Sequence, residues 1–355
     1  MNEQIKEKEK IKQQTLCFFR DSCEKGNLEI AKKLIDENYW LFICDELNFR
    51  WVCNHGHLEV AQWLFEKKVN AIIEFAFCEA CQYGHMEVIK WLFEKMKMDP
   101  PPEQDYNEMF EWSLRAACSQ GQLEVAQWLL EIKPDINIHI CTMVFDTICE
   151  NGHLILAKWF FDWLLKKKTN LNFEQTFHWV CFYGKLEVAQ WLLEIKPDIN
   201  INGVPHESTF KKVCENGHLK VAQWLLEIKP NIDISYNECF LWACYCGQTE
   251  VAKWLFEKKK DIDISSVDDF AFRNACRNGH FETAKWLLDV KPDINVFSRN
   301  DFAFENSCRN GFVKIAEWIE HLYPWLYKII KNSNTLMPYV NNVKEQNVLK
   351  QNSFI

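Results

Sequence analysis

Apolar residues recur along the chain at helical spacing, in short segments that come in pairs. Residues 268–296 show one such pair. A first apolar stripe contains Phe272, Ala275 and Cys276. A second apolar stripe, at 281–288, follows Gly279. Apolar positions three and four residues apart lie on one face of an α-helix. The segment therefore predicts two antiparallel helices joined at the glycine.

The same frame returns ten times around a glycine. Cysteine stands three residues before each glycine, phenylalanine seven before it in nine copies, and tryptophan seven after it in nine copies. The glycines are Gly26, Gly56, Gly84, Gly121, Gly152, Gly184, Gly217, Gly247, Gly279 and Gly311. The chain is therefore an array of one repeat of about 32 residues. A repeat this short cannot bury its own apolar face, so neighbouring repeats must stack on one another.

Two positions in the repeat predict a local backbone conformation. The glycine permits the left-handed conformation that a tight turn between helices requires. The sequence Lys-Pro-Asp-Ile-Asn-Ile (133–138 and 196–201) is expected to be extended, because the residue before proline avoids the α region. Each repeat should be a helix, a turn, a second helix and an extended loop.

Three of the turns read Gly-His-Leu, at 56–58, 152–154 and 217–219, and the loops after the second helices resemble Asp-Ile-Asn. In these residues the chain resembles ankyrin repeats. The resemblance implies an all-α, ankyrin-type solenoid of ten helix-turn-helix repeats with extended connecting loops, acting in protein–protein interaction. The richness in Trp and Cys and the near-identical copies at 125–137 and 188–200 are similar to the expanded ankyrin families of giant DNA viruses. That resemblance implies a viral protein with a host target.

The pattern divides the chain into three segments. Residues 1–13 are a polar N-terminal extension, residues 14–322 are the repeat array, and residues 323–355 are expected to form a capping helix and a flexible tail. The interval between glycines swells to 37 residues between the third and fourth copies. Three consecutive prolines at 100–102 stand there, so we expect a longer loop at 97–106.

Charge and composition restrict the binding partners and the cellular location that we expect. The formal net charge of −9 opposes nonspecific binding to nucleic acid or anionic lipid. Apolar runs are too short to span a membrane, and residues 1–14 lack the apolar stretch of a secretory signal. The 16 cysteines are therefore expected to be reduced thiols. We expect a monomeric cytoplasmic protein, in the host cytoplasm if it is viral, that binds neither nucleic acid nor membrane.

The tryptophans, cysteines and histidines that recur in the repeats do not form a recognisable catalytic, cofactor or metal site. The tryptophans and cysteines share the apolar stripes and are expected to be core. Five histidines follow a repeat glycine, but other repeats have Asn, Gln, Lys or Phe there, which favours hydrogen bonding at the turn over catalysis. Phosphate-binding loops, paired metal-binding histidines and serine elbows are absent from the sequence. We therefore expect no enzymatic activity, no cofactor and no metal.

Two alternative functions are weighed against a binding scaffold. Cys78 and Cys81 have the spacing of half a zinc site, which would suit a metal or redox sensor, but no second pair with matching spacing follows. A substrate adaptor for ubiquitin ligation would need a ligase-docking segment, and none is recognisable in residues 1–14 or 323–355.

Residues that vary between repeats predict a binding surface. Positions five, two and one before the glycine lie opposite the Phe and Cys stripe of the first helix and should line a concave groove. Trp, Tyr and Arg are enriched at binding hot spots. The candidate partner-binding residues are Trp51, His55, Tyr83, Trp179, Phe182, Tyr183, Trp242, Tyr245, Arg277 and Arg309. The alternative is that these rings only pad neighbouring helices. The expected partner is a protein of unknown identity.

Overall fold

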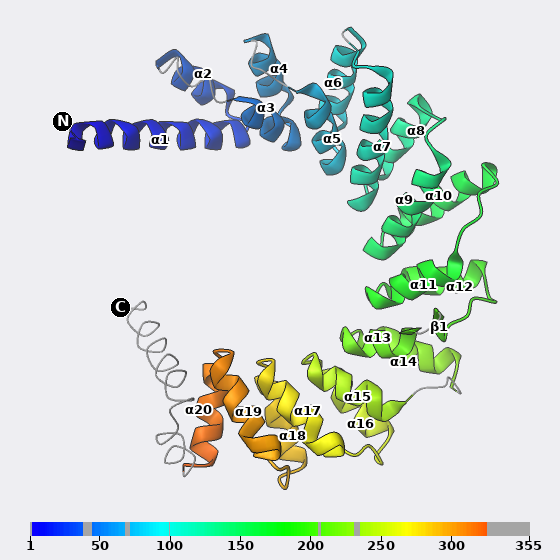
Figure 1. Cartoon of the computed structure of the whole chain (residues 1–355). Coiled ribbons are helices and arrows are strands. Elements are labelled where there is room, and N and C mark those ends of the chain that lie inside the picture. Colours follow the sequence, from blue (N-terminus) through cyan, green and yellow to red (C-terminus); the bar gives the residue numbers. More distant parts are fainter. Residues whose placement is uncertain are drawn as a thin grey trace. The chain divides into compact units, whose positions relative to one another are not determined.

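The computed structural model describes residues 2–37, 45–67, 72–98, 100–204, 207–230 and 235–324 (Figure 1). They belong to two units, Met1–Leu171 and Asn172–Ile355. The predicted capping helix and tail beyond residue 324 lie outside the described residues.

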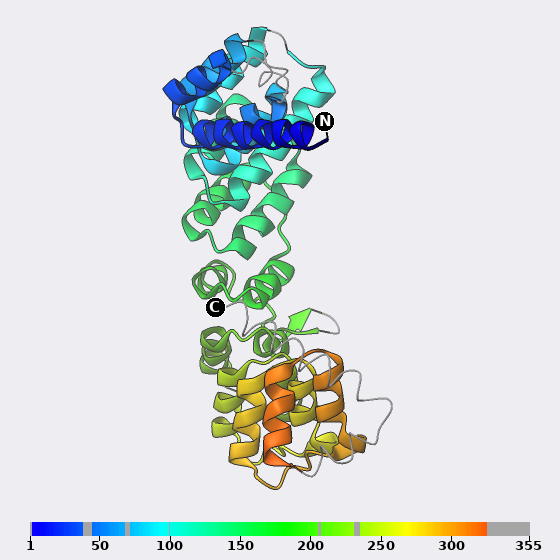
Figure 2. The same cartoon turned by 90° about the vertical axis from the view of Figure 1, so that its left-hand side faces the viewer.

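Among the described residues, each unit has five helix pairs, in which an odd-numbered first helix precedes an even-numbered second helix. The first unit contains α1 (Asn2–Glu24), α2 (Leu28–Glu37), α3 (Asp45–Asn54), α4 (Leu58–Glu66), α5 (Ile73–Tyr83), α6 (Met86–Met98), α7 (Glu103–Ser119), α8 (Leu123–Ile132), α9 (Ile138–Asn151) and α10 (Leu154–Lys166). Neighbouring first helices pack on one another from α1 to α9. The polar N-terminal extension is helical, because α1 is one uninterrupted helix (Figure 2).

The second unit repeats this arrangement. It contains α11 (Phe173–Phe182), α12 (Leu186–Ile195), α13 (Thr209–Glu215), α14 (Leu219–Ile228), α15 (Tyr236–Tyr245), α16 (Thr249–Lys258), α17 (Ser266–Arg277), α18 (Phe281–Val290), α19 (Ser298–Arg309) and α20 (Val313–Leu322). Two short strands, β1 (Gly203–Val204) and β2 (Glu207–Ser208), pair antiparallel in the loop before α13, with Gly203 opposite Ser208. The stacked helix pairs confirm the predicted all-α repeat fold.

The repeat glycine makes the turn between the two helices, as predicted. All ten repeat glycines have positive φ, from 68° to 84°. At Gly56 the glycine N–H donates to the carbonyl of Cys53 at 3.2 Å, and the N–H of His57 donates to the carbonyl of Val52 at 3.1 Å. This pair of hydrogen bonds is a Schellman motif, which satisfies carbonyls at the end of the first helix.

The connecting loops contribute to the core. Lys133 and Lys196, each before a proline, leave the helical conformation with ψ of 79° and 78°. The expected extended segments are wrong in part, because residues 134–135 and 197–198 form turns and α9 already begins at Ile138. The isoleucines that follow bury their side chains, with exposed fractions of 6% for Ile136 and 5% for Ile199. Each loop therefore returns an apolar side chain to the stack after leaving the second helix.

The core itself is built from the repeated phenylalanines and cysteines. Phe177 and Phe240 are fully buried, and all ten repeat cysteines are buried. The tryptophans only partly match their predicted place in the core: eight of the nine are half-buried, and only Trp191 is buried. Trp224 packs against Phe177 of the preceding repeat, with ring centroids 6.3 Å apart. An indole ring is rarely enclosed completely, and here it covers the seam between two repeats.

The expected long loop at 97–106 is wrong. Helix α6 continues to Met98 and α7 begins at Glu103, so only residues 99–102 connect them. Pro102 is not helical, with φ −49° and ψ 146°. The helix begins at the next residue, Glu103. Glu103 and Asp105 lie in the first turn of α7, where negative charge complements the helix dipole. The inserted residues therefore lengthen two helices.

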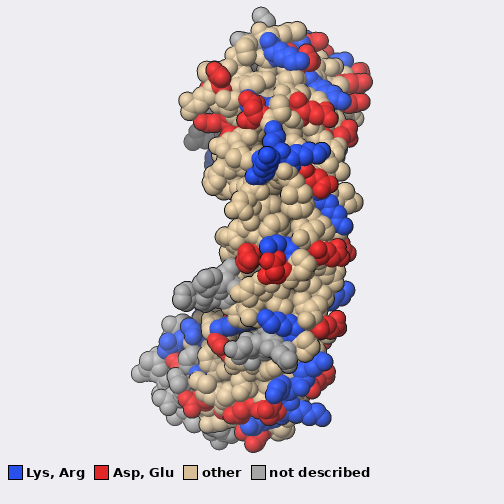
Figure 3. All heavy atoms as spheres, turned by 90° about the vertical axis from the view of Figure 1, so that its right-hand side faces the viewer, with Lys and Arg blue, Asp and Glu red and all other residues tan. Residues whose placement is uncertain are grey.

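Charges of both signs are interspersed on the molecular face shown in Figure 3, and no large patch of one sign stands out there. Within the described ranges, no helix combines the length and apolar character needed to cross a bilayer.

Candidate protein-binding surface

The candidate residues lie on the last turns of the first helices, beside the glycine turns. This placement follows from the repeat frame: the Phe and Cys stripe faces the stack, so positions five, two and one before the glycine face away from it. Three of the candidates are strongly exposed, with exposed fractions of 51% for Trp51, 47% for Tyr83 and 45% for Tyr183. Such exposure of large rings is what a binding surface requires.

The first aromatic cluster of the second unit lies at the end of α11. The ring of Trp179 is 5.2 Å from that of Phe182 and 6.2 Å from that of Tyr183, measured between centroids. Phe182 and Tyr183 meet edge to face at 5.1 Å. Trp179 and Phe182 are half-buried and Tyr183 is exposed. The three rings therefore brace one another and leave part of their surface open.

The second aromatic cluster joins α15 and α17. The rings of Trp242 and Tyr245 lie 5.1 Å apart, and Phe270 of α17 is 6.4 Å from Trp242 and 6.2 Å from Tyr245. The ammonium group of Lys211 lies 5.3 Å from the centre of the Trp242 ring and forms an ion pair with Glu238. This cluster therefore spans two repeats and has a cation at its edge.

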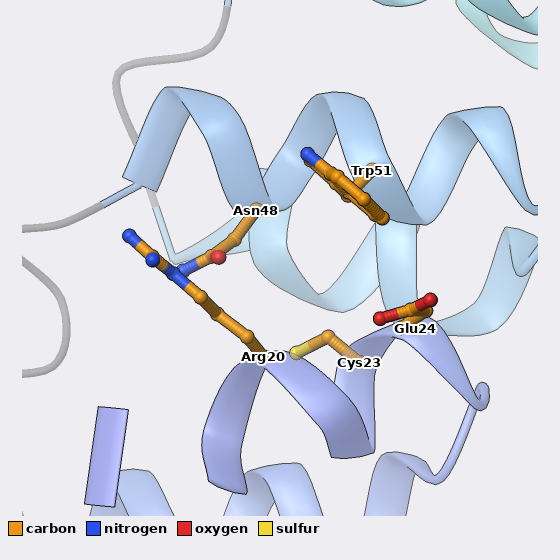
Figure 4. Close-up of a pocket in the computed structure, with 5 residues that line it drawn as sticks. All are labelled: Arg20, Cys23, Glu24, Asn48 and Trp51. Carbon is orange, nitrogen blue, oxygen red and sulfur yellow. The ribbon is translucent and has the colours of Figure 1, made fainter. Parts of the chain in front are cut away.

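In the first unit, the rings of Trp51 and His55 stack at 5.6 Å, and His55 stacks on His57 at 6.3 Å. The Nε2 atom of His55 is 3.8 Å from a carboxylate oxygen of Glu24. Trp51 and Asn48 of α3 face α1 across a pocket of about 160 Å³ (Figure 4). Two candidate residues are therefore brought together here, one of them at the edge of a small pocket.

The remaining candidates stand apart from these clusters. Tyr83 is the last residue of α5, and its side chain is exposed. Arg277 and Arg309 end α17 and α19 and are both exposed. Arg309 forms an ion pair with Glu305 of its own helix. The positive charge predicted for this end is therefore partly compensated within α19.

The sequence reasoning missed the position nine residues before the glycine. It lies about one helical turn before the position five residues before the glycine and continues the same face. Phe75, Trp112 and Met143 occupy it in three consecutive repeats, with exposed fractions of 52%, 61% and 44%. Phe270, which completes the second aromatic cluster, occupies it in another repeat. The sequence does contain a signal for this position: an apolar residue stands on the helix face opposite the Phe and Cys stripe, where a polar residue is expected.

The repeated histidines connect neighbouring repeats. The Nε2–H of His57 donates to the carbonyl of Glu24 at 2.7 Å, and that of His153 donates to the carbonyl of Ser119 at 2.9 Å. Burial lowers the pKa of His85, His218 and His280 below the ordinary value. These contacts are hydrogen bonds at turns, as predicted, but they cross to the preceding repeat instead of capping the histidine's own helix.

The cysteines are free wherever the structure describes them. Burial raises the pKa of nine repeat thiols, for example that of Cys308 to about 12, so these nine are weak nucleophiles at neutral pH. The Sγ of Cys78 lies 3.1 Å from Ser113 Oγ, and Cys81 is fully buried. Within the described ranges, no group of three or more His, Cys, Asp or Glu side chains is arranged to hold a metal ion.

Stacked helix pairs, a left-handed glycine at every turn and a variable face on the first helices define a helical repeat protein. The family described as "Ankyrin repeats (3 copies)" matches residues 49–140 and 177–268, just over half of the chain. The chain belongs to the ankyrin repeat family. Among solved structures, the crystal structure of the human ASB11 ankyrin repeat domain matches this chain with 19% identity and a TM-score of 0.38, over 54% of this chain and 95% of that chain. A comparison with curated proteins finds no match.

Proposed function

We propose that this protein is a non-enzymatic scaffold that binds a protein partner through the variable face of its first helices. The observation that carries the proposal is the pair of aromatic clusters in the second unit, at Trp179 and at Trp242. Large rings that are held by one another lose little conformational freedom on binding, which is why such rings serve as anchors.

The partner is a protein with apolar groups for the two clusters and acidic groups for Arg277. The proposal includes monomeric function in the cytoplasm, without nucleic acid or membrane ligands. A viral setting with a host target also belongs to the proposal, and it rests on the sequence resemblance alone. Cys81 is fully buried, and burial raises the pKa of both the Cys78 and the Cys81 thiol, so the scaffold is preferred to a sensor.

The proposal predicts that Trp179→Ala combined with Tyr183→Ala reduces capture of cellular proteins by the purified chain. Removing two hot-spot rings costs about 2 kcal/mol or more of binding free energy. The measurement is an affinity capture from cell lysate, followed by mass spectrometry, with the wild type and the double variant side by side.

A matched control is Ile228→Ala combined with Val290→Ala, because these apolar side chains at the ends of second helices are exposed to a similar degree, 43% and 40%. The control should capture the same proteins as the wild type. Circular dichroism must show that both variants are folded. An unchanged set of captured proteins with the aromatic variant would refute the proposed surface.

A further inference from the structure

A second apolar surface lies in the first unit, between α5 and α7. Phe75 of α5 and Trp112 of α7 line a cleft of about 570 Å³. Its inner part includes Met109, which is almost fully buried, and Cys78, whose Sγ lies 3.7 Å from the Met109 carbonyl oxygen. The two rings are more than half exposed. The cleft therefore has a packed interior and open aromatic sides.

The insertion between the third and fourth repeats contributes residues to the lining of the cleft. Because the inserted residues extend α7 to Glu103, its first two turns add Asp105 and Glu108 to the cleft lining. Glu74, in the first turn of α5, supplies a third carboxylate. In the part of the chain that the structure describes, none of these three carboxylates forms an ion pair. Three carboxylates therefore line the cleft beside two exposed rings, and one of them, Glu108, accepts a hydrogen bond from Gln104 at 3.2 Å.

The rings already contact cationic groups of the chain itself. The guanidinium carbon of Arg50 lies 5.1 Å from the centre of the Phe75 ring, and that of Arg115 lies 5.5 Å from the centre of the Trp112 ring. Neither arginine lines the cleft. Guanidinium groups bind aromatic faces and carboxylates at once, because the plane stacks while its edge donates hydrogen bonds. The open sides of the cleft offer this combination to a partner.

We propose that the cleft between α5 and α7 binds a protein segment in which Arg or Lys alternates with apolar side chains. The basic side chains contact Glu74, Asp105 and Glu108, and an apolar side chain enters between Phe75 and Trp112. This site is separate from the two aromatic clusters of the second unit, and it deepens the proposed function by naming the chemistry of a bound partner.

The test uses the full-length protein and a short fluorescent peptide of alternating Arg and Leu, with binding followed by fluorescence anisotropy. Wild type should bind this peptide more tightly than a peptide of alternating Glu and Leu or of alternating Arg and Ser. Trp112→Ala should weaken binding about tenfold, as loss of an anchoring ring does. Asp105→Asn with Glu108→Gln should weaken it severalfold and flatten its salt dependence.

Matched controls separate the cleft from the rest of the surface. Ile155→Ala removes a side chain of α10 that is 75% exposed, and Glu124→Gln removes an exposed carboxylate of α8. Both should bind the peptide like the wild type. Trp112→Ala removes a ring that is 61% exposed, so the fold should survive, and circular dichroism checks this.

Equal binding of all three peptides, or unchanged binding by the Trp112→Ala protein, would overturn the proposal. Occupation of the cleft by a second copy of the chain would also overturn it, and would appear in sedimentation as a dimer that Trp112→Ala dissociates. The variant with Trp179→Ala and Tyr183→Ala should bind the peptide normally. The experiments can therefore refute the binding role of the aromatic clusters and the binding role of this cleft separately.

Discussion

The repeat glycine meets two separate requirements. Its backbone is left-handed, which costs another residue about 1–2 kcal/mol. It also lies beneath a side chain of the next repeat: a Cβ on Gly247 would stand 2.4 Å from Nδ1 of His280, and one on Gly217 would stand 2.1 Å from Oε1 of Gln248. The turn therefore leaves no room for a side chain at eight of the repeat glycines.

This double requirement predicts different costs for Gly247→Ala and Gly311→Ala. Both glycines have φ of 75°, but a Cβ on Gly311 would meet nothing within 4 Å. We expect Gly311→Ala to lower the free energy of unfolding by about 1–2 kcal/mol, and Gly247→Ala to cost about 1–3 kcal/mol more because the imidazole must move. Urea unfolding of both variants measures the difference. Equal losses would show that the His280 contact adds nothing.

Single residues were predictable where one local rule decides their environment. The glycine conformation and the burial of the Phe and Cys stripe follow from helix periodicity alone. The half-burial of Trp224 did not follow, because it depends on how far the next repeat covers the ring. The open cleft beside Trp112 was missed for a similar reason: whether an apolar residue on a helix packs or stays exposed is decided by its neighbour in space.

Hydrogen bonds across the seam tie each helix pair to the one before it. The side-chain amide of Asn278 donates to the carbonyl of Tyr245 at 2.9 Å, and that of Asn310 donates to the carbonyl of Arg277 at 2.8 Å. The imidazole rings of His218 and His280 donate to the backbone carbonyls of Phe182 and Tyr245. The ends of α11, α15 and α17 are therefore held by the following repeat.

Protonation of the seam histidines should destabilise the array. Burial lowers the pKa of His85, His218 and His280 below about 6.5, so the unfolded chain binds more protons than the folded one between the two pKa values. Their contribution to stability is then fully present above about pH 6.5 and falls as the pH drops through this value. The midpoint of urea unfolding should decrease accordingly.

Replacement of all three histidines by glutamine provides the control, since Gln122 and Gln248 occupy the equivalent place in other repeats. The triple variant should remain folded and lose less stability than the wild type between pH 7 and pH 5. Carboxylates titrate equally in both proteins and cancel in the comparison. Identical pH profiles would exclude the histidines as the source.

The helix pairs were predictable from the sequence, but the residues at which the helices begin and end were predictable only in part. The three prolines at 100–102 stop a helix, yet they do not show whether the surrounding residues form a loop or longer helices. Several helix starts use Asn or Ser caps, such as Asn172 accepting from the N–H of Gln175. The short β1–β2 pair depends on two segments meeting across a loop, which periodicity does not report.

At the scale of the whole molecule, the division into two units has no counterpart in the repeat spacing. The interval from Gly152 to Gly184, which crosses the division, is 32 residues, the typical value in this chain. Each unit nevertheless has five helix pairs and buried phenylalanines of its own. In repeat proteins stability is approximately the sum of repeat and neighbour terms, so either unit holds most of what it needs to fold.

We therefore expect residues 172–355, expressed alone, to fold. The fragment should show a helical circular dichroism spectrum and a cooperative urea transition, because it retains the contacts among α11 to α20. A disordered fragment would show that this unit depends on residues 1–171. If it folds, it should also retain the aromatic clusters at Trp179 and Trp242 and lack the cleft at Trp112.

The glycine turn also bears on how such a chain could grow. Most helix pairs bring both a bare glycine and the His, Gln or Phe side chain that covers the glycine before it, so a copied segment carries a complete joint at either end. The near-identical stretches at 125–137 and 188–200 are what duplication of such segments would leave behind. Gly311, with nothing above it among the described residues, is the point where another copy could be added. The length of the array is therefore free to change while its joints stay the same.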